Sequence, residues 1–175
     1  MASNSLPHPE SPSPSADERR QANIGEARGF LPGKSLDPPA IHSLANRLQS
    51  VNEFGLARPL YRRLRKKGVF TGIQDTPAKI GQRHALCTYK DADEPAGDRF
   101  ERALEILGEV DQLKLTDPEQ AESLGLRGAI YKRKWQTEGQ VGDLHRSLAQ
   151  YLQGHAIGPQ HDQGWNGINA AFVLD

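Results

Sequence analysis

Residues 116–175 read TDPEQAESLGLRGAIYKRKWQTEGQVGDLHRSLAQYLQGHAIGPQHDQGWNGINAAFVLD, and this stretch decides the fold. Thr116 and Glu119 form a T-x-x-E capping box with a proline between them, which predicts a helix start. Two sets of residues follow at the spacing of a helix face and predict two helices. The first set is Leu124, Gly128, Ala129, Tyr131 and Trp135, and the second is Leu144, Leu148, Tyr151, Leu152 and Ile157. Gly158-Pro159 closes the second helix, and Trp165 opens another apolar run. The stretch therefore predicts one helical hairpin, with a turn over residues 136–142, and the start of a further unit.

Two more hairpins are expected upstream. Asp37 precedes two prolines and Thr76 precedes Pro77, and each pair is typical of a helix N-cap followed by its first turn. Asn52 is predicted to cap the second helix of the first hairpin, and Gly68 is predicted to end that helix. The acidic, proline- and glycine-containing segment 91–97 separates the two helices of the next hairpin. Since no alternating strand pattern of useful length occurs, the fold class is all-α.

Composition excludes several classes of function. Lysine plus arginine and aspartate plus glutamate both total 22, so the chain lacks the net positive field of a general nucleic-acid or membrane-surface binder. No apolar run approaches the roughly 18 residues of a membrane span, and the N-terminus lacks the apolar region of a secretory signal. Cys87 is the single cysteine, so an intrachain disulfide is excluded. We expect a cytoplasmic protein.

The first 36 residues differ from the rest of the chain. Four prolines alternate with serine and other polar residues before Ser15. Such a composition buries too little apolar surface to offset the entropy lost on ordering. We therefore predict a disordered tail over residues 1–36 and a helical repeat domain over residues 37–175.

The hairpins resemble tetratricopeptide repeats. In those repeats a small residue lies where the two helices cross, and a larger residue fills the groove made by the next hairpin. Ala45 and Ala57 in the first hairpin have the spacing that the repeat uses, and Gly128 occupies the small position of the third. The second hairpin departs from the pattern, because Leu86 stands at its small position. The resemblance implies a right-handed stack of about three hairpins plus a partial fourth.

The last 60 residues resemble a narrower family, the TRAFs-binding domain of apoptosis signal-regulating kinases and of many bacterial tetratricopeptide proteins. The family's Leu-Gly-x-x-Gly-x-x-Tyr-Lys pattern is matched at Leu124, Gly125, Gly128, Tyr131 and Lys132. Its Gly-Ile-Asn-Ala-Ala segment is matched at Gly167, Ile168, Asn169, Ala170 and Ala171. No kinase domain is present, so the resemblance implies no catalysis. It implies an array that continues beyond residue 171, completed past Asp175 or by another chain.

No enzymatic constellation emerges from the sequence. The histidines are scattered without metal-ligand spacing, so we expect no metal and no cofactor. His84 and Cys87 lie three residues apart, as a base and a nucleophile could, but a buried core cysteine is the preferred interpretation. The Gly33-Lys34-Ser35 segment lacks the glycine spacing and the preceding strand of a phosphate-binding loop. We do not expect an enzyme.

Two groups of residues are candidates for binding. The basic run of the first hairpin comprises Arg58, Arg62, Arg63, Arg65, Lys66 and Lys67. This run is either a phosphate-binding patch or a solvated helix end. The acidic segment 91–98 is expected to pair either with this run or with Lys132-Arg133-Lys134. The second group is Tyr131, Trp135, Trp165 and Asn169, which are either packing residues or a partner-binding surface.

The function predicted from these observations is protein–protein interaction. A helical-repeat groove would present a concave surface to a peptide or a partner helix, as a scaffold or regulatory module. The open C-terminal helix, residues 165–174, predicts a homo-oligomer. The alternative is a regulatory module of a bacterial stress or defence system that binds nucleic acid or a nucleotide through the basic run. Nucleic acid is not the expected partner, because the net charge is zero.

Overall fold

A computed structural model describes residues 15–30, 37–68 and 70–175, and these residues form helices joined by short loops, without a strand. The helices are α1 (Ala16–Phe30), α2 (Pro38–Ser50), α3 (Phe54–Lys67), α4 (Pro77–Lys90), α5 (Ala96–Val110), α6 (Asp117–Glu138), α7 (Val141–Ile157) and α8 (Trp165–Leu174), with a 3₁₀ turn at Pro159–His161. The all-α prediction is confirmed. Among the described residues, no helix has the length and apolar character needed to cross a bilayer.

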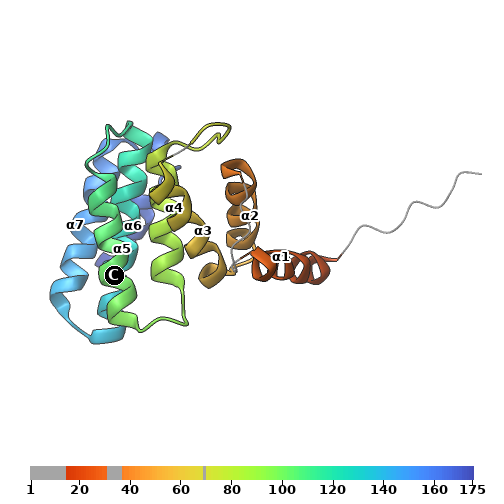
Figure 1. Cartoon of the computed structure of the whole chain (residues 1–175). Coiled ribbons are helices and arrows are strands. Elements are labelled where there is room, and N and C mark those ends of the chain that lie inside the picture. The colour runs from red at the N-terminus through yellow and green to blue at the C-terminus, as the bar shows by residue number, and fades with distance from the viewer. Residues whose placement is uncertain (1–14, 31–36, 69) are drawn as a thin grey trace, which may run out of the picture.

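The helices stack as hairpins. α2 packs on α3, α4 on α5, and α6 on α7, and each hairpin also contacts the next one along the chain. Figure 1 shows α4 to α7 standing side by side as neighbouring columns, with α2 and α3 at one end of the stack and α1 beyond them. α8 packs on α7, so the stack holds three hairpins and the first helix of a fourth unit, as the sequence predicts.

Local sequence explains where α2, α4 and α6 begin. The Asp37 carboxylate accepts a hydrogen bond from the backbone N–H of Ala40, 2.9 Å away, and caps α2. The hydroxyl of Thr76 caps α4 in the same way. At α6, Glu119 accepts hydrogen bonds from the backbone N–H and the hydroxyl of Thr116, so the capping box is present. These three predicted helix starts are confirmed.

Three local predictions need correction. Glu53, rather than Asn52, is the N-cap of α3, because Asn52 lies in the left-handed region with φ 62°. α6 continues through Glu138, into the expected turn at 136–142, and ends at Gly139, whose φ of 73° suits glycine. Within the tail predicted to be disordered, residues 16–30 form α1, whose Ala27 is buried. The remaining tail residues, 1–14 and 31–36, lie outside the described part, and the domain boundary at residue 37 stays a prediction.

The apolar core has two parts. One lies between α1, α2, α3 and α4 and includes the fully buried Ile41, Leu44 and Leu64. The other lies between α4, α5 and α6 and includes Phe100 and Ile130. α4 contributes to both parts, so this helix joins the first hairpin to the rest of the stack.

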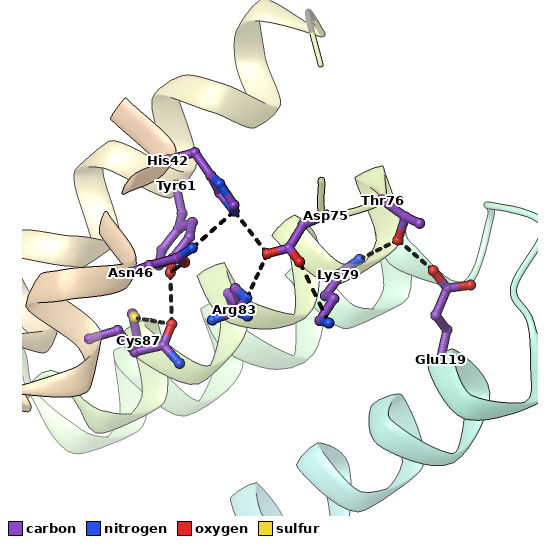
Figure 2. A network of polar contacts seen from close by, with 10 residues as sticks. His42, Asn46, Tyr61, Asp75, Thr76, Lys79, Arg83, Cys87 and Glu119 are labelled. Atoms are coloured by element: carbon purple, nitrogen blue, oxygen red, sulfur yellow. Dashed lines mark hydrogen bonds and ion pairs between the residues drawn. The ribbon is translucent and has the colours of Figure 1, made fainter. Parts of the chain in front are cut away.

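A polar network crosses the same junction and is shown in Figure 2. Asp75, just before α4, lies 2.8 Å from Nε2 of His42 on α2 and 2.9 Å from Nε of Arg83. Burial of this carboxyl opposes ionisation, but the hydrogen bond to His42 and the charge of Arg83 lower its pKa. Nearby, the buried Tyr61 hydroxyl donates to Oδ1 of Asn46 at 2.6 Å. The network therefore fixes the first hairpin against α4 by directional contacts as well as by apolar packing.

Candidate functional site

The basic run on α3 faces a groove of about 800 Å³ bounded by α3, α4 and α5. This surface, called here the mixed-charge groove, has basic residues Arg58, Arg62, Arg65, Lys66 and Arg102 and acidic residues Glu94, Glu105 and Glu109. Arg58 lies 3.0 Å from the Asp91 carboxylate and 2.6 Å from that of Glu94. Arg65 pairs with Glu109 at 2.6 Å. Ion pairs within the protein therefore occupy part of the basic run, and the acidic segment 91–98 supplies some of them.

Two buried groups on α4, His84 in the groove wall and Cys87 in the first core, have separate partners. His84 accepts a hydrogen bond at Nδ1 from Arg65, 2.8 Å away. Burial and the positive charge of Arg65 lower the pKa of His84 to about 3, so the imidazole is neutral at ordinary pH. Cys87 is fully buried in the first core, where its Sγ lies 3.9 Å from Gln49, and burial raises the thiol pKa to about 12. Neither group has the exposure or the pKa of a catalytic base or nucleophile.

A second groove, of about 680 Å³, is bounded by the C-terminal halves of α4 and α6, by α7 and α8, and by the first turns of α3 and α5. We call it the cationic groove. Its basic residues are Lys90, Arg99, Lys132 and Arg133. Its aromatic residues are Phe54, Tyr89, Phe100, Tyr151 and Trp165. The other lining residues are small or uncharged, so no carboxylate faces the basic ones from the groove wall.

The four basic side chains rest on aromatic rings or donate hydrogen bonds to uncharged groups. The ammonium of Lys90 lies 5.2 Å from the centre of the Phe54 ring, and the guanidinium of Arg99 lies 5.1 Å from that of Phe100. Arg99 also donates to the backbone carbonyl of Asp91. Within the described part of the chain, none of the four forms an ion pair with an acidic side chain. Their charge is therefore available to a ligand.

Lys132 is the basic residue most closely enclosed by other groups. Its ammonium donates to Oδ1 of Asn169 on α8, 3.1 Å away, and lies 4.8 Å from the centre of the Phe172 ring. Burial, followed by the neighbouring charge of Arg133, lowers the pKa of this lysine. Lys132 therefore joins the floor of the groove to α8.

Close helix contacts set the position of the aromatic wall. Tyr151 is fully buried on α7, and its ring lies edge-on to Trp165 with centroids 5.6 Å apart. A Cβ at Gly128 would lie 2.6 Å from the Tyr151 ring, and a Cβ at Gly154 would lie 2.4 Å from Asn166. These two glycines, of which Gly128 belongs to the family-like motif, therefore leave the space in which Tyr151 and the start of α8 pack.

Sequence reasoning identified part of this site. Trp165 and Asn169 line the cationic groove, as a partner-binding surface would require. Tyr131 does not; its ring faces Arg146 of α7 at 5.9 Å, and Trp135 is likewise absent from the groove wall. Lys134 pairs with Glu101 rather than with the acidic segment.

The groove's own basic residues were missed as a group. Lys132-Arg133 was noticed only as a possible ion-pair partner for acidic residues. The signal in the sequence is a basic pair one helical turn after a small residue, Gly128, in the helix that begins at Asp117.

Comparison with known proteins gives one family match. A family model described as Tetratricopeptide Repeats-Sensor matches residues 53–174, which includes α3 to α8 and both grooves. No curated protein and no solved structure matches the chain.

Proposed function

The chain belongs to the Tetratricopeptide Repeats-Sensor family, and on that premise we propose that it is a binding module that holds a segment of a partner protein in the cationic groove. Repeats of this type generally mediate interactions between proteins and are typically not catalytic. Their stacked hairpins form an extended surface whose shape depends on the packing between neighbours. The narrower resemblance to the TRAFs-binding domain remains an interpretation.

One observation carries the proposal: the cationic groove combines exposed ring surface with uncompensated charge. Trp165 is 45% exposed although it packs on Tyr151, and aromatic residues with partial exposure are enriched where proteins bind one another. The groove is open along several helices, which suits an extended segment better than a compact ligand. Asn169 adds a side-chain amide that can bond a peptide backbone.

The alternative, nucleic-acid or nucleotide binding through the basic run of α3, has less support. Phosphate binding requires basic side chains whose charge is free to neutralise the ligand. Arg58 and Arg65 instead pair with carboxylates of the protein, and Glu105 also lines the same groove. The ligand would have to displace these pairs.

A selection from a random peptide library tests the proposed function without assuming the ligand's charge. We expect peptides that bind the native protein and lose at least about tenfold in affinity when Trp165→Ala and Asn169→Ala are combined. Leu152→Ala, which removes an equally exposed apolar side chain outside the groove, is the matched control and should change affinity little. Circular dichroism melting would confirm that each variant is folded. Failure to select peptides, or selected peptides indifferent to the groove variant, would refute the proposal.

A further inference from the structure

We infer that the segment held in the cationic groove is an acidic peptide whose carboxylates lie against Lys132, Arg133 and Arg99 and whose apolar side chain lies against Trp165. This inference rests on the proposed function and specifies the chemistry of the partner. The preference for an acidic peptide does not come from the protein's net charge, because lysine plus arginine equals aspartate plus glutamate in the whole chain. It comes from the placement of basic residues around the groove.

The contrast between the two grooves is the first argument. Both contain several basic residues, but the mixed-charge groove also contains three glutamates, and two of these form ion pairs across it. The cationic groove has no acidic lining residue. Like charges held near one another repel, and this repulsion is stronger in a partly enclosed site than in water. A bound carboxylate would relieve it.

The second argument concerns hydrogen-bond donors. Tyr151 lines the groove and is fully buried, yet its hydroxyl has no hydrogen-bond partner within the described structure. The Nε–H of Arg99 is also buried without a partner, although the same guanidinium donates through Nη1 to a backbone carbonyl. Buried polar groups are normally paired. Both groups belong to residues of the groove wall, so their unpaired donors agree with the acceptor-rich ligand that the charge distribution favours.

The third argument concerns shape. The basic residues are distributed over three helices, with Lys90 on α4, Arg99 on α5 and the Lys132-Arg133 pair on α6, and aromatic residues line the same groove. A compact polyanion would engage one end of this arrangement. A peptide chain that carries acidic residues on either side of a large apolar one can place charge near each cation and a ring near Trp165. An acidic peptide therefore fits the whole wall.

Fluorescence anisotropy with a labelled short peptide of glutamates flanking a central phenylalanine tests the inference. We expect this peptide to bind at least about tenfold more tightly than the same peptide with glutamine for glutamate, and the difference should shrink as salt is raised. Combining Lys132→Gln with Arg133→Gln should weaken binding of the acidic peptide by about tenfold or more. The matched control combines Arg62→Gln with Lys66→Gln, which removes the same charge from the mixed-charge groove and should change affinity by less than about twofold.

The possible outcomes separate the two proposals. Equal affinity for the acidic and amide peptides, or equal loss in both double variants, would overturn the inference about charge. If the peptides selected from the library still lost affinity when Trp165 and Asn169 were changed, the proposed function would stand even though the inference about charge had failed. Inorganic polyphosphate that displaced the acidic peptide at a lower concentration than the unlabelled peptide itself would assign the groove to phosphate ligands and also overturn the inference. Thermal melting of both double variants excludes unfolding as the cause of lost binding.

Discussion

At the scale of single residues, glycines determine how closely the last three helices approach. Gly128 on α6 faces the Tyr151 ring, and Gly154 on α7 faces the buried amide of Asn166 on α8. Any side chain at these positions must displace a group that is itself fully enclosed. Gly128, which belongs to the motif that resembles the TRAFs-binding domain, therefore has a packing role, and it positions the Tyr151 ring in the wall of the candidate groove.

Gly128→Ala should destabilise the fold. The added methyl would lie 2.6 Å from an atom of a fully buried ring, so the helices must separate, and we expect a loss of about 1–3 kcal/mol in the free energy of unfolding. Urea denaturation measures this change. Gly108→Ala on α5 is the control, because its methyl meets nothing within 4 Å, and the higher helix propensity of alanine should stabilise the fold by about 0.5–1 kcal/mol. Equal effects of the two substitutions would contradict the packing explanation.

His84 should make stability fall in mild acid. Its pKa is lowered from 6.5 to about 3 by burial and by Arg65. Between these values the unfolded chain binds a proton that the folded chain does not, so stability is lost as pH falls below 6.5. Near pH 5 the expected loss from this residue is about 2 kcal/mol. Urea unfolding of the native chain and of His84→Gln, at neutral pH and near pH 5, isolates the contribution of His84. If the variant lost as much stability in acid as the native chain, the loss would not come from His84.

At the scale of elements, Glu119 connects two helix starts. Its carboxylate accepts from the backbone and hydroxyl of Thr116 at the start of α6, and also from the hydroxyl of Thr76 at the start of α4. Burial opposes its ionisation, but these hydrogen bonds lower its pKa. One side chain therefore serves the capping box of its own helix and ties that helix to the preceding hairpin.

Glu119→Ala should cost about 1–2 kcal/mol in the free energy of unfolding, because it removes a cap and an interhelix hydrogen bond together. Gln120→Ala, at the next position of the same helix, removes an exposed side chain and should cost less than about 0.5 kcal/mol. Chemical denaturation of the two variants provides the comparison. Similar small costs for both would show that the bridge between α4 and α6 contributes little.

The sequence predicts several helix starts correctly but does not predict which residues line the candidate groove, for physical reasons. Asp37, Thr76 and Thr116 act on backbone groups within one turn, so a few neighbouring letters suffice. The predicted end of α6 is wrong because a glycine ends a helix only where its backbone adopts the left-handed conformation. Local composition does not specify which glycine does so.

The cationic groove depends on contacts that are distant in the chain. Lys90 and Lys132 are more than forty residues apart and share a wall only because α4 and α6 stack. Tyr131 is adjacent to Lys132 in sequence but faces α7, because each residue along a helix rotates by about 100°. Spacing within one helix therefore predicts a face, but the partner of that face follows from the stack.

At the scale of the whole molecule, α8 leaves one end of the stack uncovered. It packs on α7 through the buried Asn166 and Ala170, while Ile168 and Phe172 are 69% and 66% exposed. The predicted homo-oligomer would bury this face.

Self-association through α8 is expected to weaken when its outer face is made polar. Combining Ile168→Ser with Phe172→Ser should shift sedimentation equilibrium toward monomer, because contiguous exposed apolar surface promotes association. Val141→Ser is the control, since Val141 is also exposed but lies at the start of α7. A native chain that remains monomeric across the accessible concentration range would refute the prediction.

The bridge at Glu119 has a mechanical consequence for the groove. α4 and α6 are joined by hydrogen bonds at their N-terminal ends, whereas their C-terminal halves bound the cationic groove and have no hydrogen bond between them among the described residues. At that end the two helices are held by apolar packing, through residues such as Tyr89 and Ile130. An occupant of the groove that contacts both Lys90 and Arg133 would therefore add polar contacts between α4 and α6 at the end where they have none.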